Sequence, residues 1–293
     1  MSFKFNYEKP NIIAEIGCNH MGDMDIAKEL IDLAKESMVE IVKFQTRSNK
    51  LLLTEEQYNA PHPNPSNSYG KTYGEHREFL EFNQSQHREL KNYCESKGII
   101  YSTSTWDIES AKMIAELDPV FIKVPSACNN NYEMLKYLRD EYKGQVQISF
   151  GMTTLEEEDE VIKFFEETDQ AKERLIIYSC TSGYPVPFED VSLLEIKRMY
   201  DKYSDRVKSI GFSGHHLGVA IDIAAYTLGA RWIERHFTKD RTWKGTDHAA
   251  SLEPGGLKKL VRDLNASYKA LTFKKNEILE IEQVQRQKLK NRK

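Results

Sequence analysis

Short apolar runs recur along the chain, and most are followed by a segment with helical periodicity. The runs are rich in Ile, Val and Phe, which favours buried strands. In the segments between them, apolar residues recur three and four positions apart, as Leu30, Leu33 and Ala34 do. The predicted strands are 12–17, 40–46, 99–104, 120–125, 146–151, 175–181, 209–215 and 230–238. The predicted helices are 24–37, 85–97, 108–117, 132–142, 154–167, 192–203, 218–228 and 253–271.

Alternation of strand and helix through eight units predicts an α/β protein with a (β/α)₈ TIM-barrel fold. The alternative is an open doubly wound sheet, but no Gly-x-Gly-x-x-Gly follows the first predicted strand. A length of 293 residues also suits one barrel better than two domains. We therefore expect a single barrel domain over residues 1–272, followed by a charged C-terminal tail over residues 273–293.

Alternate residues of a barrel strand point to the interior, so strand parity predicts which polar groups gather there. Acids, bases, amides and hydroxyls fall on this face near the carboxyl ends of nearly every strand, where barrel enzymes have their active sites. For any one of them, the alternative is a side chain that faces the helices or forms an internal salt bridge. The predicted interior set is Glu15, Lys43, Gln45, Ser102, Ser104, Lys123, Gln147, Ser149, Ser213, His215, Glu234 and His236, with Ser126 just beyond Lys123.

Two interior lysines on different strands, Lys43 and Lys123, indicate a site for a multiply charged anion. Lysine supplies a point charge, and the surrounding serine hydroxyls can direct hydrogen bonds to phosphate or carboxylate oxygens. The alternative role is a Schiff-base lysine, which needs one desolvated amine. No feature of the sequence singles out one lysine as a nucleophile, so the pair favours an anion-binding site.

The last two predicted strands both end near a histidine. Burying Glu234, Arg235 and His236 without partners is costly, so we expect a ligand or metal to be the partner. Neutral imidazoles of His215 and His236 suit a divalent ion, whereas the alternative is two core histidines satisfied by the backbone. Asp247 follows in a loop that contains glycine, where it could bind sugar hydroxyls or cap a turn.

Composition narrows the class of protein further. The formal charge is −4 with scattered basic residues, so no nucleic-acid partner is expected. No apolar run is long enough to span a bilayer, and the N-terminus lacks a signal-peptide core, so we expect a cytoplasmic protein without a membrane partner. The four cysteines have no metal or disulfide spacing and are expected to be free thiols. The long connection over 47–83 indicates a lid over the site or a disordered segment.

Several motifs, in order along the chain, resemble the N-acetylneuraminate (sialic acid) synthase family. Two further stretches are most similar to the animal branch, whose product is the sialic acid 9-phosphate and whose acceptor is a sugar 6-phosphate. The family motifs are 13–23 (IAEIGCNHMGD), 43–45 (KFQ), 178–185 (YSCTSGYP), 211–215 (GFSGH) and 234–236 (ERH). The branch-like stretches are 69–76 (YGKTYGEH) and 243–254 (WKGTDHAASLEP).

The resemblance implies condensation of phosphoenolpyruvate with an open-chain N-acylated hexose, using a divalent metal such as Mn or Mg. The enol carbon would attack the aldehyde, water would add to the resulting oxocarbenium carbon, and phosphate would leave. The product would be a sialic-acid-like nonulosonate, made from an N-acetylmannosamine-like aldose or its 6-phosphate. The resemblance also implies a homodimer.

The resemblance assigns roles position by position. The catalytic residues would be Glu15, which would act on water bound to the metal or on the aldehyde oxygen, and the metal ligands His215 and His236. Gln45, Tyr184 and Asp247 would contact the sugar, together with Trp106 and the long connection. The residues that would hold phosphoenolpyruvate are Lys43, Ser104, Lys123, Ser126, Ser149, Ser182 and Ser213.

Some features depart from the family pattern. Cys128 stands where members carry an acidic residue, and Ser182 where bacterial members often have Asn. Members also carry a C-terminal antifreeze-like domain, whereas this sequence continues into the charged tail. From this we expect closure of the site by the long connection and the tail, closure by a separate protein, or an acceptor that needs no cap. Two other functions stay open, namely a metal-dependent aldolase or isomerase acting on a sugar and a non-catalytic ligand-binding relative.

Overall fold

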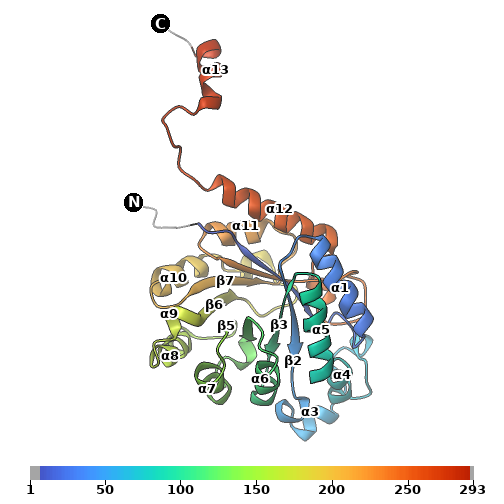
Figure 1. The fold of residues 1–293 in the computed structure, drawn as a ribbon. Coiled ribbons are helices and arrows are strands. Elements are labelled where there is room, and N and C mark those ends of the chain that lie inside the picture. Colours follow the sequence, from blue (N-terminus) through green and yellow to red (C-terminus); the bar gives the residue numbers. More distant parts are fainter. Residues whose placement is uncertain (1–6, 291–293) are drawn as a thin grey trace.

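A computed structural model describes residues 7–290 and shows a closed barrel of eight parallel strands inside a layer of helices (Figure 1). Each strand pairs with the next one in sequence, and β1 closes the barrel against β8. The predicted barrel is confirmed, although strand boundaries differ by a few residues. The strands are β1 (Asn11–Gly17), β2 (Ile41–Thr46), β3 (Ile100–Thr105), β4 (Phe121–Val124), β5 (Gln145–Ser149), β6 (Leu175–Cys180), β7 (Ser209–Gly214) and β8 (Trp232–His236).

The helices of the outer layer begin at polar capping residues and bury an apolar stripe against the strands. Asp23 accepts hydrogen bonds from the first backbone N–H groups of α1, and Thr154 and Glu157 form a capping box at the start of α8. In α1 the buried residues are Ala27, Leu30, Ile31 and Ala34, which confirms the predicted periodicity. The main helices are α1 (Met24–Glu36), α5 (Gln84–Ser96), α6 (Ile108–Ala115), α7 (Tyr132–Asp140), α8 (Leu155–Glu166), α10 (Leu194–Tyr203), α11 (Ala220–Thr227) and α12 (Pro254–Ala270).

The strand register divides the barrel interior into an apolar and a polar level. Glu15 lies opposite Lys43 on β2 and His236 on β8. Two residues earlier on the same face, Ile13 joins an apolar cluster completed by Ile41, Phe121, Ile176, Tyr178 and Trp232. This cluster fills the amino end of the barrel and leaves the polar groups at the carboxyl end. The predicted strand parity is therefore confirmed.

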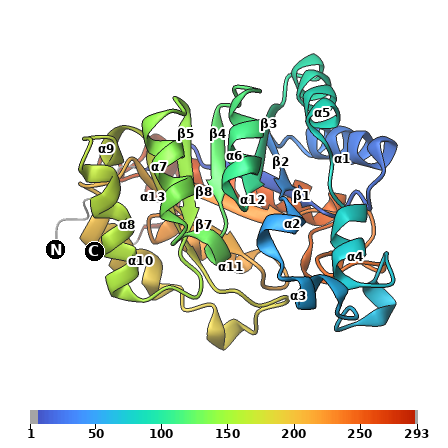
Figure 2. The same ribbon diagram turned by 90° about the horizontal axis from the view of Figure 1, so that it is seen from below.

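The long connection between β2 and α5 is ordered and lies beside the carboxyl end of the barrel. It folds into α2 (Asn49–Leu52), α3 (Glu55–Asn59), the 3₁₀ turn η1 (Pro65–Asn67) and α4 (Tyr73–Phe79), which lie together in Figure 2. The Tyr69 hydroxyl donates a hydrogen bond to the carbonyl of Lys244, which ties this connection to the loop after β8. Gly22, at φ 74°, lets α4 approach closely, because a Cβ there would lie 2.4 Å from the Phe79 carbonyl oxygen.

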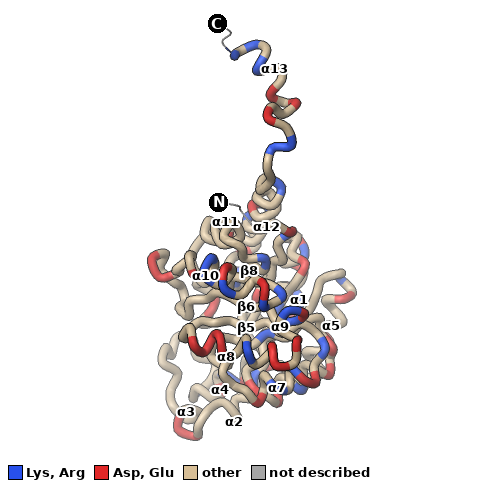
Figure 3. Tube along the Cα trace, turned by 90° about the vertical axis from the view of Figure 1, so that its left-hand side faces the viewer, with Lys and Arg blue, Asp and Glu red and all other residues tan. Residues whose placement is uncertain are grey.

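The C-terminal part differs from the rest of the molecule. After α12, residues 271–279 lead to α13 (Glu280–Leu289), which stands clear of the barrel (Figure 1). Acidic and basic residues alternate along this part and over the helical layer (Figure 3). The predicted domain boundary at residue 272 stays a prediction. Among residues 7–290, no helix combines the length and apolar character needed to cross a membrane.

Short elements complete the fold and connect the main helices and strands. They are η2 (Ser126–Cys128), α9 (Ala171–Arg174), η3 (Phe188–Asp190) and η4 (His248–Ala250). The four cysteines are free thiols, as expected.

Candidate active site

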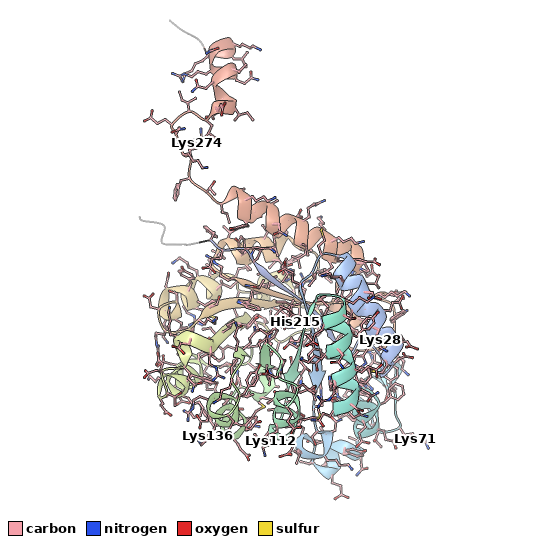
Figure 4. The ribbon with its side chains drawn as sticks, in the orientation of Figure 1. Lys28, Lys71, Lys112, Lys136, His215 and Lys274 are labelled. Carbon is pink, nitrogen blue, oxygen red and sulfur yellow. The ribbon has the colours of Figure 1, made fainter. Side chains whose placement is uncertain are left out.

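The carboxyl ends of the strands surround a cavity of about 320 Å³. His215 lies in the middle of the barrel, whereas Lys28, Lys112 and Lys136 lie on the outside of the helical layer (Figure 4). Asp247 does not line the cavity. Its carboxylate lies 3.8 Å from Nδ1 of His236, which is a cavity-lining residue. All the other predicted site residues line the cavity: Glu15, Lys43, Gln45, Ser104, Lys123, Ser126, Ser149, Ser182, Tyr184, Ser213, His215 and His236, together with Trp106.

Two buried ammonium groups and two buried carboxylates form the floor of this cavity. Lys123 Nζ lies 2.6 Å from Oε1 of Glu234, which also accepts a hydrogen bond of 3.0 Å from the Ser213 hydroxyl. Lys43 Nζ contacts a carboxylate oxygen of Glu15 and lies 3.8 Å from Oε2 of Glu234. Glu234 was predicted to face the interior, with a ligand or metal as its partner and no assigned role; in the structure its partners are the two lysines.

The surroundings shift the pKa values of the two carboxyl groups in opposite directions. Burial raises the pKa of Glu15, and the nearby Glu234 adds to this against the opposing effect of Lys43. Burial also acts to raise the pKa of Glu234, but Lys123 and Lys43 together lower it below its ordinary value. Such a split is typical of a site in which one acid stays ionised and the other can hold or release a proton.

Several polar atoms of the cavity have no hydrogen-bond partner within residues 7–290. The Ser149 hydroxyl, Oε2 of Glu234 and Nδ1 of His236 are buried and make no hydrogen bond there. Buried polar atoms without a partner are rare, because each one loses its hydration on folding. The arrangement therefore fits a polar ligand that supplies the missing contacts.

The two predicted metal ligands lie side by side at the rim of the cavity. The ring centroids of His215 and His236 are 5.4 Å apart. Nδ1 of His215 donates to the Thr181 carbonyl at 3.1 Å, which leaves Nε2 with its lone pair. Burial and the neighbouring His236 lower the pKa of His215 to about 3, so this imidazole is neutral. Within the described part of the chain, no three or more His, Cys, Asp or Glu side chains are grouped to hold a metal.

Arg235 does not share in this site, which corrects the expectation that a ligand or metal is its partner. It points to the outside of the barrel, where its guanidinium lies 2.5 Å from the carboxylate of Asp222 on α11. It also donates to the carbonyls of His216 and Gly218. Arg235 and Asp222 are buried, so the ion pair connects β8 to α11, and the two carbonyl hydrogen bonds connect β8 to the loop after β7.

Another buried group, beside the cavity, was not predicted from the sequence. Arg47 stacks on the Trp106 ring at 4.1 Å and donates a hydrogen bond to the side-chain oxygen of Gln45, and both of these residues line the cavity. Glu81 lies 3.0 Å from Arg47 and 3.7 Å from Arg77 of α4. All three residues belong to the long connection, which has no strand periodicity that could have identified them.

Comparisons with known proteins agree with this architecture. The model of the NeuB family matches residues 30–276. Human N-acetylneuraminate-9-phosphate synthase is 39% identical over 278 residues, which cover 95% of this chain and 76% of the human protein. The N,N'-diacetyllegionaminic acid synthase of Campylobacter jejuni is 32% identical over 264 residues, covering 90% of this chain and 78% of that protein.

A solved structure gives the same result. The N-acetylneuraminic acid (sialic acid) synthetase of Leptospira borgpetersenii, in complex with citrate, superposes with a TM-score of 0.80 at 27% sequence identity. The match covers 100% of this chain and 97% of that one. Family model, sequence relatives and structure agree, and the chain belongs to the NeuB family, the N-acetylneuraminate (sialic acid) synthases that its motifs resemble.

Proposed function

We propose that this protein condenses phosphoenolpyruvate with an N-acylmannosamine-type aldose, or its 6-phosphate, to give a sialic-acid-like nonulosonate and phosphate. The observation that carries the proposal is that one cavity joins two buried lysines, two imidazoles and a carboxyl group whose pKa is raised. Relatives over most of the chain are named as synthases of N-acetylneuraminate 9-phosphate and of diacetyllegionaminic acid. A homodimer and a cytoplasmic location are part of the same proposal.

The lysines and hydroxyls at the floor are the proposed binding site for phosphoenolpyruvate. Lys43 donates to the Ser104 hydroxyl at 2.5 Å, and the Ser126 hydroxyl accepts from the Gly151 N–H at 2.9 Å. The site therefore offers ammonium groups and hydroxyls to phosphate and carboxylate oxygens. Ser149, Ser182 and Ser213 are the further hydroxyls in reach of the same space.

Glu15 is the proposed acid–base group. Its Oε1 accepts a hydrogen bond of 3.0 Å from the Gln45 amide, which fixes the carboxyl group at the cavity wall. When the enol carbon bonds to the aldehyde carbon, the aldehyde oxygen gains a proton, and a carboxyl group with a raised pKa can provide it. Water then adds to the carbon that carries the phosphate and gives its proton to the Glu15 carboxylate, and the bond from that carbon to the phosphate oxygen breaks to leave a keto group and inorganic phosphate.

His215 and His236 are the proposed ligands of a divalent ion, Mn or Mg. The free lone pair on His215 and the unpartnered Nδ1 of His236 fit this role, with water or substrate oxygens as the remaining ligands. A bound ion would polarise the aldehyde of the acceptor. Gln45 and Tyr184 line the cavity, Asp247 lies beside His236, and these three residues are the proposed contacts for the sugar.

Purified protein incubated with phosphoenolpyruvate, Mn and N-acetylmannosamine or its 6-phosphate is expected to release phosphate only when sugar is present. Mass spectrometry of the product should show the sum of the two carbon skeletons without the phosphate of phosphoenolpyruvate. Removing the metal with EDTA is expected to stop the reaction, and adding Mn back should restore it.

Three results would contradict the proposal. Sugar turnover without phosphoenolpyruvate would favour an aldolase or isomerase. Calorimetric binding of phosphoenolpyruvate with no phosphate release across a panel of aldoses would favour a non-catalytic relative. Full activity in EDTA would remove the metal role.

A further inference from the structure

Tyr178 of β6 is fully buried, and the face of its ring lies against the ammonium group of Lys123. Lys123 Nζ lies 4.0 Å from the ring centroid. At this distance the negative face of an aromatic ring attracts a cation, and the attraction is strongest where water is excluded. Lys123 lines the cavity, whereas Tyr178 belongs to the apolar cluster that fills the amino end of the barrel. Tyr178 therefore reaches the site through Lys123 and not through the cavity wall.

The ring matters to Lys123 because few oxygen atoms hold this side chain. Within residues 7–290, its ammonium group has one oxygen partner, Oε1 of Glu234 at 2.6 Å. The ammonium group of Lys43, by comparison, contacts the Glu15 carboxylate and lies 2.5 Å from the Ser104 hydroxyl. An ammonium group has three N–H donors. With one donor on Glu234 and the ring covering another side, Lys123 keeps a donor for a ligand in the cavity.

Two contacts fix the ring of Tyr178. Its hydroxyl donates a hydrogen bond of 2.6 Å to Oε1 of Gln147, which lies opposite Lys123 on the neighbouring strand β5. The ring also packs closely against β7 at Gly211, where a Cβ would lie 2.5 Å from Cε1 of Tyr178. Burial raises the pKa of Tyr178 far above its ordinary value, so the hydroxyl stays neutral and can donate. The ring is therefore a fixed, uncharged surface for the ammonium group.

We propose that Tyr178 is a positioning residue for phosphoenolpyruvate, because its ring holds the ammonium group of Lys123 in place and directs the free N–H donor towards the bound anion. This inference rests on the proposed function, in which Lys123 binds phosphoenolpyruvate. Tyr178 does not line the cavity, so its effect on the substrate acts through Lys123. The ring carries this effect, whereas the hydroxyl contributes to the stability of the barrel through Gln147.

The test compares wild-type protein with Tyr178→Phe and Tyr178→Met, which both lose the hydroxyl but differ in the ring. Tyr178→Phe should melt at a lower temperature, because the buried Oε1 of Gln147 loses its hydrogen bond, and should keep the wild-type KM for phosphoenolpyruvate. Tyr178→Met should raise that KM on the order of 10-fold, as expected for loss of a desolvated cation–π contact. The KM for the sugar should stay the same in both variants, and kcat should change less than the KM for phosphoenolpyruvate.

Tyr203→Met on α10 is the matched control, because Tyr203 is also fully buried and does not line the cavity. It should lower the melting temperature and leave the KM for phosphoenolpyruvate unchanged. Adding Gln147→Leu to both Tyr178 variants removes the unpaired amide, so the same comparison can be made in more stable proteins. The inference is overturned if Phe and Met at position 178 raise the KM for phosphoenolpyruvate equally, or if neither raises it.

A binding measurement separates failure of this inference from failure of the proposed function. Calorimetry with phosphoenolpyruvate, without sugar, does not depend on turnover. Binding that is weakened in Tyr178→Met and kept in Tyr178→Phe supports the positioning role even if no sugar leads to phosphate release. Equal affinity in all three proteins would overturn the positioning role even if the synthase is active, and a wild-type protein that does not bind phosphoenolpyruvate would overturn both.

Discussion

Replacing Lys123 by Met is expected to abolish phosphate release and to lower the free energy of unfolding by about 3–5 kcal/mol. Lys123 and Glu234 are both buried, with their charged atoms 2.6 Å apart. Removing the ammonium group leaves a carboxylate whose closest remaining cation is Lys43, at 3.8 Å. Urea denaturation would measure the stability, and the phosphate assay would measure the activity.

The double variant Lys123→Met/Glu234→Leu separates the two effects. It removes both charges, so most of the lost stability should return, because a buried ion pair can often be replaced by apolar residues at little cost. Activity should stay absent, since the proposed ligand for phosphoenolpyruvate is still missing. A single variant as stable as wild type would contradict the ion pair, and an active double variant would contradict the binding role.

Replacing Glu15 by Gln is expected to lower kcat by roughly 10²- to 10⁴-fold, the usual contribution of a general acid or base. The two side chains have nearly the same shape, and Lys43 keeps its contacts with Ser104 and Glu234. The variant loses the buried ion pair between Glu15 and Lys43, so its melting temperature should fall, but it should remain folded and bind phosphoenolpyruvate. Steady-state kinetics and a thermal melt would test both expectations.

Glu29→Gln is a control for this variant, because Glu29 is on the surface, 44% exposed and paired with Lys239. Its kcat should be that of wild type, since exposed ion pairs contribute little. A Glu15→Gln enzyme that keeps more than about a third of its kcat would rule out the proton-transfer role.

The strand residues of the site could be predicted because strands have a period of two. Parity placed Glu15, Lys43 and His236 on the interior, and in the structure they lie on neighbouring strands at one level. Serines on other strands reached the cavity for the same reason. The fold and the residues of the cavity wall can therefore be predicted from the period of two along each strand, together with closure of the barrel.

Pairings between distant residues could not be predicted in the same way. Lys123 and Glu234 are 111 positions apart, and no local pattern indicates that they meet. The prediction that a ligand or metal is the partner of Arg235 was wrong. Its burial was evident from its position in the sequence, but its pairing with Asp222 depends on how α11 packs against β8. Arg77 and Glu81 lie in or next to short helices of a long connection, where no repeat marks a functional face.

The most direct test of the central claim is a crystal structure of the protein with Mn and phosphoenolpyruvate. We expect the phosphate and carboxylate groups of phosphoenolpyruvate to contact Lys43, Lys123 and the cavity serines, with the metal on His215 and His236. Phosphoenolpyruvate bound outside this cavity, or a metal held by other residues, would contradict the account.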